Sequence, residues 1–304
     1  MNDGELKYTI QADFWHDLNE IAEAMLDDEG YKNIDSSKAV QQLINARYRC
    51  LVAKHRDIEQ SDVFVCPSEC IDALNLIKSK VVSGDNLTPF MTRSMKNASF
   101  KDGLLNVEHI YHFHLSTQID KDGFMKRSGH LLMAYVDDDR FYMITIYKHN
   151  EQPFENQELI NIIHRNWSEL ADKRKADGVI GLSYNVDDAS YRLFRKANVN
   201  MLHENNGRVY GSLGDTVALD GTPLFVLDEE AVLKNMCSEI KYTMYSQDAQ
   251  LHDLISSESG KSVAKMHFRL IELGAGICRV LEENTGIIVN HILQTDIFFC
   301  ENNV

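Results

Sequence analysis

Histidine is concentrated in one stretch of this 304-residue chain, residues 109–149, together with a short basic loop. An imidazole titrates near neutral pH, so it can carry a proton to or from a substrate, and in its neutral form it can bind a metal ion. Lysine and arginine side chains beside it could hold a phosphate. The candidates for such chemistry are His112, His114, His130 and His149, with Lys121, Lys126 and Arg127 of the loop.

The residues around these histidines predict three strands. Apolar residues alternate with His112 and His114, which is the pattern of a strand with one buried face. Residues 130–136 are almost continuously apolar, and three aspartates at 137–139 form a polar turn before the next apolar run. We therefore expect one antiparallel sheet made of residues 109–115, 130–136 and 141–147.

A metal site is one alternative for the histidines. His112 and His114 lie two residues apart, so they share one face of a strand, and His130 or His149 from neighbouring strands could complete a zinc site. Such a site would make the protein a metallohydrolase. However, no carboxylate lies at a ligand spacing beside these histidines, and a solvent-facing or polar seam explains them more simply. We expect no metal and no cofactor.

Residues 122–149 carry a further pattern. A basic loop with Lys126, Arg127 and Gly129 leads into an apolar strand, an acidic turn follows, and the last strand ends in His149. This pattern resembles the C-terminal half of RelE/ParE-superfamily toxins, most closely the YoeB type, over about residues 100–150. The resemblance implies a small α/β fold with a curved antiparallel sheet. Ribonuclease members of that family cut messenger RNA on the ribosome without a metal.

The resemblance also implies roles for individual residues. His149 matches the catalytic acid histidine at the end of the last strand, and Glu108 is the counterpart of the general base. Leu131 occupies the place of an arginine that stabilises charge on the phosphate in the ribonuclease members, and such a loss costs several kcal/mol. Arg127 or Lys126 could substitute from the loop. The side chains expected to contact the substrate are Lys121, His130, His112 and His114.

The N-terminal flank has the pattern of helices. Apolar residues recur at helical spacing, which predicts a unit of three helices over residues 1–84. Residues 84–97 contain a proline and several polar residues, a composition typical of a linker before a β unit at 98–150. The residues expected to pack the three helices together are Leu18, Ile21, Leu43, Leu74 and Ile77.

The C-terminal region, residues 151–304, is expected to be mostly helical, with helix continuing to about Glu283. A hairpin is expected near 199–210, because the Asn206-Gly207 pair favours primed turns. The segment 287–299 is apolar enough for a strand or a helix. The expected fold class is therefore α+β, with a small antiparallel sheet at about 109–149 flanked by N-terminal and C-terminal helical regions.

Composition narrows the class of protein. The net charge of −15 argues against broad electrostatic capture of nucleic acid. No apolar run approaches the roughly 18 residues that a membrane span requires, and six scattered cysteines fit a reduced, cytoplasmic protein. Arg192, Arg195 and Lys196 lie at helical spacing on one face, which is typical of a solvated helix surface.

Besides the metallohydrolase, two functions remain open. The first is a cytoplasmic interaction or toxin-like protein of a mobile-element, toxin–antitoxin or phage-defence setting, built on a RelE-like sheet that has lost ribonuclease activity. The second is an active, metal-independent endoribonuclease that uses His149. A protein partner or a second copy is expected in either case, RNA or the ribosome is a further candidate partner, and no membrane is expected.

Overall fold

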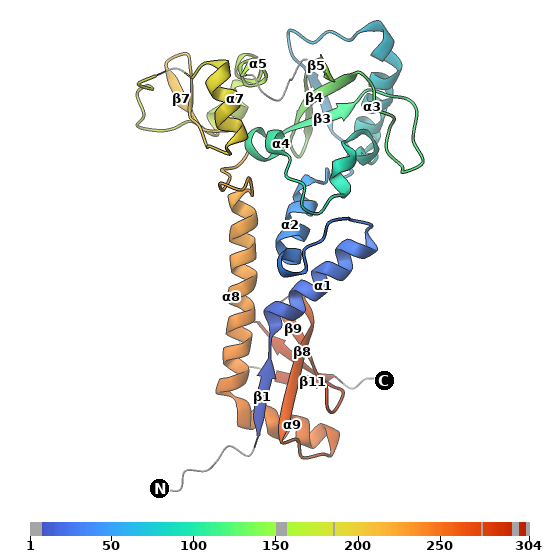
Figure 1. The fold of residues 1–304 in the computed structure, drawn as a ribbon, viewed down its shortest axis with the longest axis vertical. Coiled ribbons are helices and arrows are strands. Elements are labelled where there is room, and N and C mark those ends of the chain that lie inside the picture. Colours follow the sequence, from blue (N-terminus) through green and yellow to red (C-terminus); the bar gives the residue numbers. More distant parts are fainter. Residues whose placement is uncertain (1–7, 150–156, 185, 275, 294–297, 302–304) are drawn as a thin grey trace. The chain divides into compact units, whose positions relative to one another are not determined.

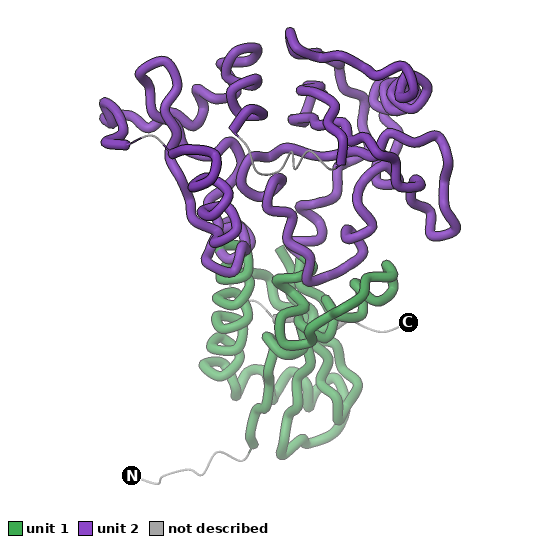
Figure 2. The backbone as a smooth tube through the Cα atoms, turned by 45° about the horizontal axis from the view of Figure 1, so that its top comes forward, with its two compact units in different colours: residues 1–43, 228–304 green, residues 44–227 purple. Residues whose placement is uncertain are grey.

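The chain folds into two compact units of α+β structure. The computed structural model describes residues 8–149, 157–184, 186–274, 276–293 and 298–301. Unit 1 consists of residues 1–43 and 228–304, and unit 2 consists of residues 44–227 (Figure 2). No helix within these described residues is long and apolar enough to span a membrane.

Unit 1 is built on a five-stranded sheet (Figure 1). Its elements are β1 (Thr9–Ala12), α1 (Phe14–Asp28), α9 (Asp248–Ser259), β8 (Lys265–Gly274), β9 (Ile277–Glu282), β10 (Ile287–Ile292) and β11 (Phe298–Glu301). The order is β1-β8-β9-β10-β11; β1 runs parallel to β8 and the other neighbours are antiparallel. The helices α2 (Ala39–Arg49) and α8 (Leu224–Ser246) contain the boundaries between the units.

The strands of unit 1 correct the prediction of a mostly helical C-terminal region. Residues 265–274 and 277–282 form strands instead of the helix expected to continue to about Glu283. Met266, Phe268 and Leu270 are buried and alternate with more exposed residues, which is the period of a strand. They pack with Ile240 of α8 and Leu251 of α9 in one core. Burial of every second residue in this core therefore decided for a strand, although the segment also contains residues that favour helices.

Unit 2 is built on a four-stranded sheet. Its elements are β2 (Asp57–Gln60), α3 (Ile71–Ser83), α4 (Gly103–Glu108), β3 (Ile110–His114), β4 (His130–Val136), β5 (Arg140–Lys148), α5 (Glu158–Asn166), α6 (Ser168–Asp172), α7 (Asp188–Lys196), β6 (His203–Asn205) and β7 (Arg208–Tyr210). The order is β2-β5-β4-β3, with β2 parallel to β5 and the remaining pairs antiparallel. The strands β6 and β7 form a separate hairpin.

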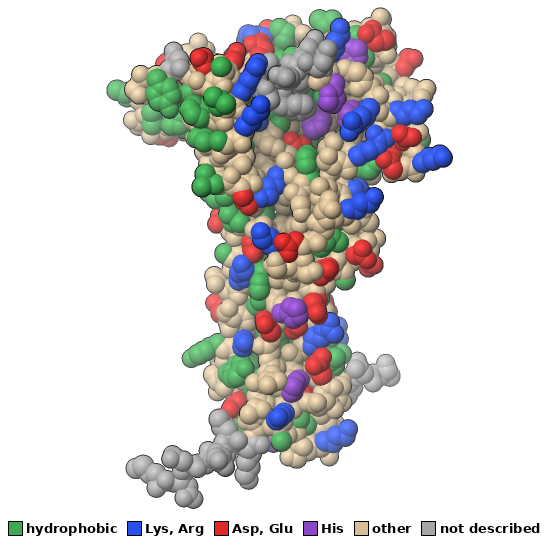
Figure 3. Space-filling model, viewed as in Figure 1, with side chains coloured by type: hydrophobic (Ala, Val, Ile, Leu, Met, Phe, Trp, Pro, Cys, Tyr) green, Lys and Arg blue, Asp and Glu red, His purple; other side chains and the backbone are tan. Residues whose placement is uncertain are grey.

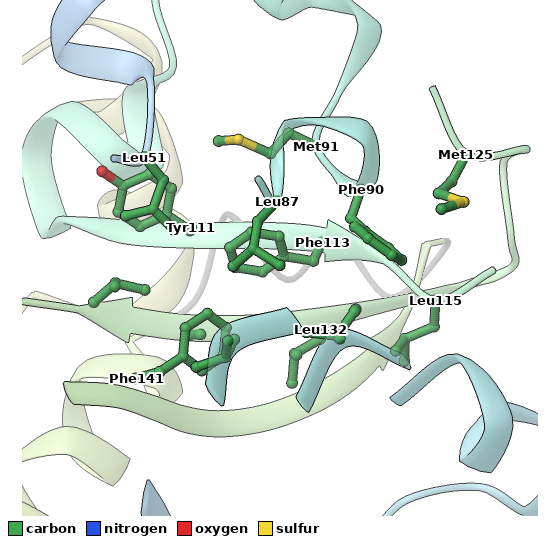
Figure 4. Packing of buried hydrophobic residues seen from close by; sticks show 14 of the residues in the cluster. Leu51, Leu87, Phe90, Met91, Tyr111, Phe113, Leu115, Met125, Leu132 and Phe141 are labelled. Atoms are coloured by element: carbon green, nitrogen blue, oxygen red, sulfur yellow. The ribbon is translucent and has the colours of Figure 1, made fainter. Parts of the chain in front are cut away.

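Both faces of this sheet are covered. On one face, Phe113, Leu132 and Phe141, which Figure 4 shows, belong to one apolar cluster. Leu74 and Ile77 of α3 are part of the same cluster. On the other face, Leu131 and Met133 pack with α5 and α6. Alternate residues of each strand thus enter different cores, so the register fixes which side chains lie on which face.

The expected linker at 84–97 belongs to the core. Leu87, Phe90, Met91 and Met95 are buried, and Figure 4 shows Leu87 and Phe90 packed over Phe113 of β3. The polar residues of this segment make two short 3₁₀ turns, Thr88–Phe90 and Arg93–Lys96, that turn the apolar side chains inward. The segment therefore covers the sheet instead of separating two domains.

The three strands predicted around the histidines are confirmed. They lie within two residues of the expected bounds and pair as one antiparallel sheet. The Asp137 carboxylate accepts the backbone N–H groups of Asp139 and Arg140 at 3.0 and 2.8 Å, which closes the expected turn. The predicted hairpin forms with Asn206 and Gly207 both at positive φ, as a primed turn requires.

Three helices, α1, α2 and α3, form within the expected range 1–84, but they do not make one unit. Leu18 and Ile21 of α1 pack against the core of unit 1, whereas Leu74 and Ile77 of α3 are buried in unit 2. Leu43 is only half-buried. The reason is that α1 follows β1, which pairs with a strand far along the chain, so it is tied to that sheet.

Gly214 tests how tightly unit 2 is packed. A Cβ at this position would lie 2.7 Å from the Asn106 oxygen and 2.8 Å from the Val107 carbonyl carbon, both backbone atoms of α4. We predict that Gly214→Ala lowers the free energy of unfolding by about 1–3 kcal/mol. Urea denaturation in a Trp15→Phe background measures this, because Trp167 then reports unit 2 alone. Gly103→Ala, where a Cβ meets nothing within 4 Å, should leave the midpoint unchanged; equal midpoints for both variants would contradict the prediction.

Candidate functional site

Three of the four candidate histidines lie on one face of the sheet in unit 2. Across the β3–β4 pair, His112 lies opposite Met133 and His114 opposite Leu131. The ring centroids of His112 and His114 are 6.3 Å apart, and the ring of His149 stacks 6.3 Å from His114. We call His112, His114 and His149 the edge histidine cluster, because β3 is an outer strand of the sheet.

His130 lies on the opposite face, so the expected grouping of four imidazoles does not form. It is opposite Lys148 in β5, and its Nε2 atom is 3.8 Å from a carboxylate oxygen of Glu69. The cause is the pleat, since His130 directly precedes Leu131 in the strand. Within the described residues, no three His, Cys, Asp or Glu side chains are arranged to hold a metal ion.

Two members of the edge histidine cluster, His112 and His114, are largely shielded from solvent. His114 is 7% exposed, and among the described residues no partner accepts from or donates to its Nδ1 atom. Burial, with smaller effects of His112, His149 and Arg127, lowers the pKa of His114 to about 4. Burial also lowers the pKa of His112, against the opposing effect of Asp102. The imidazoles of His112 and His114 are therefore neutral at pH 7, and His149 is the exposed member of the cluster.

The basic loop is held close to the sheet. Arg93 forms ion pairs with Asp120 at 2.8 Å and Asp122 at 2.5 Å, and Phe124 is buried. Arg127 is exposed and near enough to act on His114. Lys126, the other cation expected to substitute for the missing arginine, donates to the Gln118 side chain at 3.1 Å. Lys121, an expected substrate contact, is exposed. Figure 3 shows histidine beside lysine and arginine side chains on one face of unit 2.

Glu108 does not fit the role of a general base. Its carboxylate is 3% exposed and accepts from Arg195 at 3.0 Å and from the Tyr191 hydroxyl at 3.2 Å. The backbone N–H of Leu213 donates to its other oxygen at 3.3 Å. Burial raises the pKa of Glu108, and Arg195 opposes that effect. This carboxylate is engaged in a structural ion pair away from solvent.

Leu131, which stands where the resemblance places an arginine, lies in the apolar core of the sheet. Its side chain is fully buried and packs with Met133 and Ile144 against α5. A cation at this position would lie within an apolar core, where it would lose several kcal/mol of solvation without a partner. The sheet is therefore built around an apolar residue here.

A cavity of about 300 Å³ extends the edge cluster beyond the predicted residues. One wall is the segment 100–104 with His112, and the other wall is α7. Its cationic lining comes from Lys101, Arg192, Arg195 and Lys196. The sequence interpretation of α7 as a solvated surface missed this site. The spacing of three cations on one helical face was the available signal, but nothing in the sequence indicated that this face turns toward β3.

The negative charge of the chain is unevenly divided. Unit 2 holds 22 lysines and arginines against 24 aspartates and glutamates, a net charge of −2. Unit 1 holds 9 against 22, a net charge of −13. The argument against nucleic-acid capture from the total of −15 therefore applies to unit 1 and has little force for the unit that carries the histidines.

A second histidine pair, which no sequence pattern predicted, joins α5 to the hairpin. His164 and His203 face each other with 2.7 Å between their Nε2 atoms, and Tyr210 packs against both rings. Burial, with the neighbouring His164, lowers the pKa of His203 to about 4, and burial lowers that of His164. One neutral imidazole donates to the other, so this pair holds two elements together.

Comparison with known proteins gives no family for the chain. No protein-family model matches it, and no similar protein was found among the curated proteins or the solved structures. The likeness to RelE/ParE toxins stays a prediction from sequence, and the site has to be interpreted from its own geometry.

The Glu108–Arg195 ion pair gives a first test of the site. Glu108→Ala leaves a buried guanidinium without its carboxylate, and we expect the free energy of unfolding to fall by about 3–5 kcal/mol. The surface pair of Lys54 with Asp138 is the control, since Lys54→Ala should cost less than about 1 kcal/mol. Urea denaturation in the Trp15→Phe background, followed through Trp167, measures both. A midpoint for Glu108→Ala as high as that of Lys54→Ala would show that the ion pair does not stabilise unit 2.

The low pKa of His114 predicts a pH dependence. The unfolded chain takes up a proton near pH 6.5 and the folded chain only near pH 4, so stability is fully present above 6.5 and is lost as pH falls toward 4. We expect His114→Gln to flatten the fall of the urea midpoint between pH 6.5 and 4.5. His203→Gln should act in the same direction. Parallel pH curves for wild type and both variants would refute neutral, buried imidazoles.

Proposed function

We propose that unit 2 is an RNA-directed interaction module that holds a phosphodiester backbone and does not cleave it by a RelE-type mechanism. The observation that carries this proposal is the meeting of the edge histidine cluster with the cationic cavity at His112. Residues from the segments 100–114 and 192–196, with Arg127 and His149, contribute imidazole and cationic side chains to one region of unit 2.

Phosphate is the ligand chemistry that suits this region best. Arginine and lysine bind phosphate oxygens through charge-assisted hydrogen bonds, and a neutral imidazole can donate one N–H to such an oxygen. A strand of RNA presents phosphates in succession, so it can contact the cavity and the edge cluster at the same time. The near-neutral charge of unit 2 leaves local cations to decide the attraction.

Two observations support binding without RelE-type cleavage. Glu108, the expected base, is buried in its ion pair with Arg195, and Leu131 is buried where the family needs an arginine. A toxin-like interaction protein of a toxin–antitoxin, mobile-element or phage-defence setting is consistent with such a module. That setting rests on the sequence resemblance alone.

A metal-independent endoribonuclease is the second candidate, because the rings of His114 and His149 are neighbours. Two imidazoles can act as base and acid on one ribose phosphate, with the 2′-hydroxyl as nucleophile. The low pKa of His114 makes it a weak base. Binding is therefore the function that the geometry favours.

RNA binding is tested by fluorescence anisotropy with a labelled 12-nucleotide single strand at several salt concentrations. We expect Arg127→Ala and His149→Ala to weaken binding, and Arg127→Ala to reduce the slope of log K against log salt by about 0.7. Lys54→Ala, which removes an exposed cation near the 137–139 turn, is the matched control and should bind as wild type. Salt-independent or absent binding by wild type would refute the proposal.

The same samples separate the two candidates. RNA that stays intact during incubation supports a binding module. Cleavage that wild type performs and that folded His149→Ala does not perform would instead favour the endoribonuclease.

A further inference from the structure

The cavity between α7 and the segment 100–104 combines two kinds of surface. Phe100 and the largely buried Leu104 give it an apolar part, whereas Arg192 and Lys196 line it from α7. We propose that this cavity binds a single nucleotide, with the base against Phe100 and Leu104 and the phosphate at Arg192 and Lys196. The inference rests on the proposed function and names the ligand unit that the site takes.

The walls of the cavity are held in place before any ligand binds. Arg195 donates to the Glu108 carboxylate at 3.0 Å and to the Gly103 carbonyl oxygen at 3.2 Å, so it ties α7 to the start of α4. Lys101 is bound to the Asp220 carboxylate at 2.7 Å. A ligand therefore meets a cavity whose shape is already formed, which lowers the entropy that binding would otherwise cost.

The positions of the other two cations suit a phosphate. Arg192 and Lys196 are four residues apart, so they lie one turn from each other on the same face of α7, and both line the cavity. Asp102 is the carboxylate of the lining, and it accepts the Leu105 backbone N–H at 3.1 Å and lies 3.7 Å from His112. That carboxylate is thus turned toward the helix start and the imidazole.

The size and the apolar wall distinguish a nucleotide from a bare anion. A volume of about 300 Å³ is at the lower end of small-molecule sites, which matches one nucleotide and is too small for two stacked ones. A phosphate ion alone would leave Phe100 and Leu104 without a ligand group to cover them. A base offers an aromatic face that stacks on such side chains.

The nucleotide could come from solution or from an RNA strand, because both present the same base and phosphate. Three probes distinguish these sources: inorganic phosphate, adenosine monophosphate, and a 12-nucleotide single strand. We expect adenosine monophosphate to bind and phosphate to bind at least 10-fold more weakly. A strand that binds more tightly than the mononucleotide indicates that the edge cluster holds neighbouring phosphates.

Gly103 offers a variant that fills the cavity. It lines the cavity, its φ lies outside the left-handed region, and a Cβ there would have no heavy atom within 4 Å. Gly103→Phe should therefore fold while occupying the space meant for the base. We expect it to weaken adenosine monophosphate binding at least 10-fold. Gly274→Phe, at an equally open glycine of unit 1, is the matched control and should bind as wild type.

The outcomes separate this inference from the proposed function. Unchanged mononucleotide binding in folded Gly103→Phe, or phosphate binding as tight as the mononucleotide, would overturn the nucleotide site even if the strand still binds. If wild type binds no strand, the proposed function fails by itself. If wild type then still binds the mononucleotide and Gly103→Phe does not, the nucleotide site in the cavity is supported. If wild type does not bind the mononucleotide, the nucleotide site is overturned.

Discussion

The buried ion pair between Glu108 and Arg195 is the constraint on which the rest of unit 2 depends. Glu108 ends α4, two residues before the strand that carries His112 and His114, whereas Arg195 is in the last turn of α7. The same carboxylate accepts from Leu213, so three segments distant in sequence meet at one charge. Burial makes both charges costly unless each has its partner, and this requirement fixes α7 against α4. The cavity is the space that this arrangement leaves.

The sheet could be predicted from sequence because its signals are local. The alternation around His112 and the aspartates of the 137–139 turn each depend on a few neighbouring residues, and the structure confirms the strands that they predict. The same kind of reasoning placed the hairpin at Asn206 and Gly207. Helical spacing also predicted three helices over residues 1–84, and α1 and α3 lie in that range.

The candidate site could be predicted only in part, because its geometry is set by partners far apart in the chain. The sequence indicated that His112 and His114 share a face of the strand. The register of the strands decides that His149 lies beside His114 and that His130 lies on the opposite face. The engagement of Glu108 depends on Arg195, 87 residues away. The strands β8 and β9 were missed for the same reason, since β8 pairs with β1 at the other end of the chain. The segment 287–299, for which a strand or a helix was expected, contains the strand β10.

Neutral, buried imidazoles give the proposed binding region a property that exposed lysines would lack. The lowered pKa values keep His112 and His114 uncharged, so folding does not have to bury two cations side by side. A phosphate placed beside them would favour their protonated forms and raise those pKa values. Positive charge would then develop only where a phosphate is bound, and binding would take up protons. The cations of the region attract any phosphate at a distance, whereas the uncharged imidazoles attract only one that lies beside them, so they would favour a phosphate that fits the site.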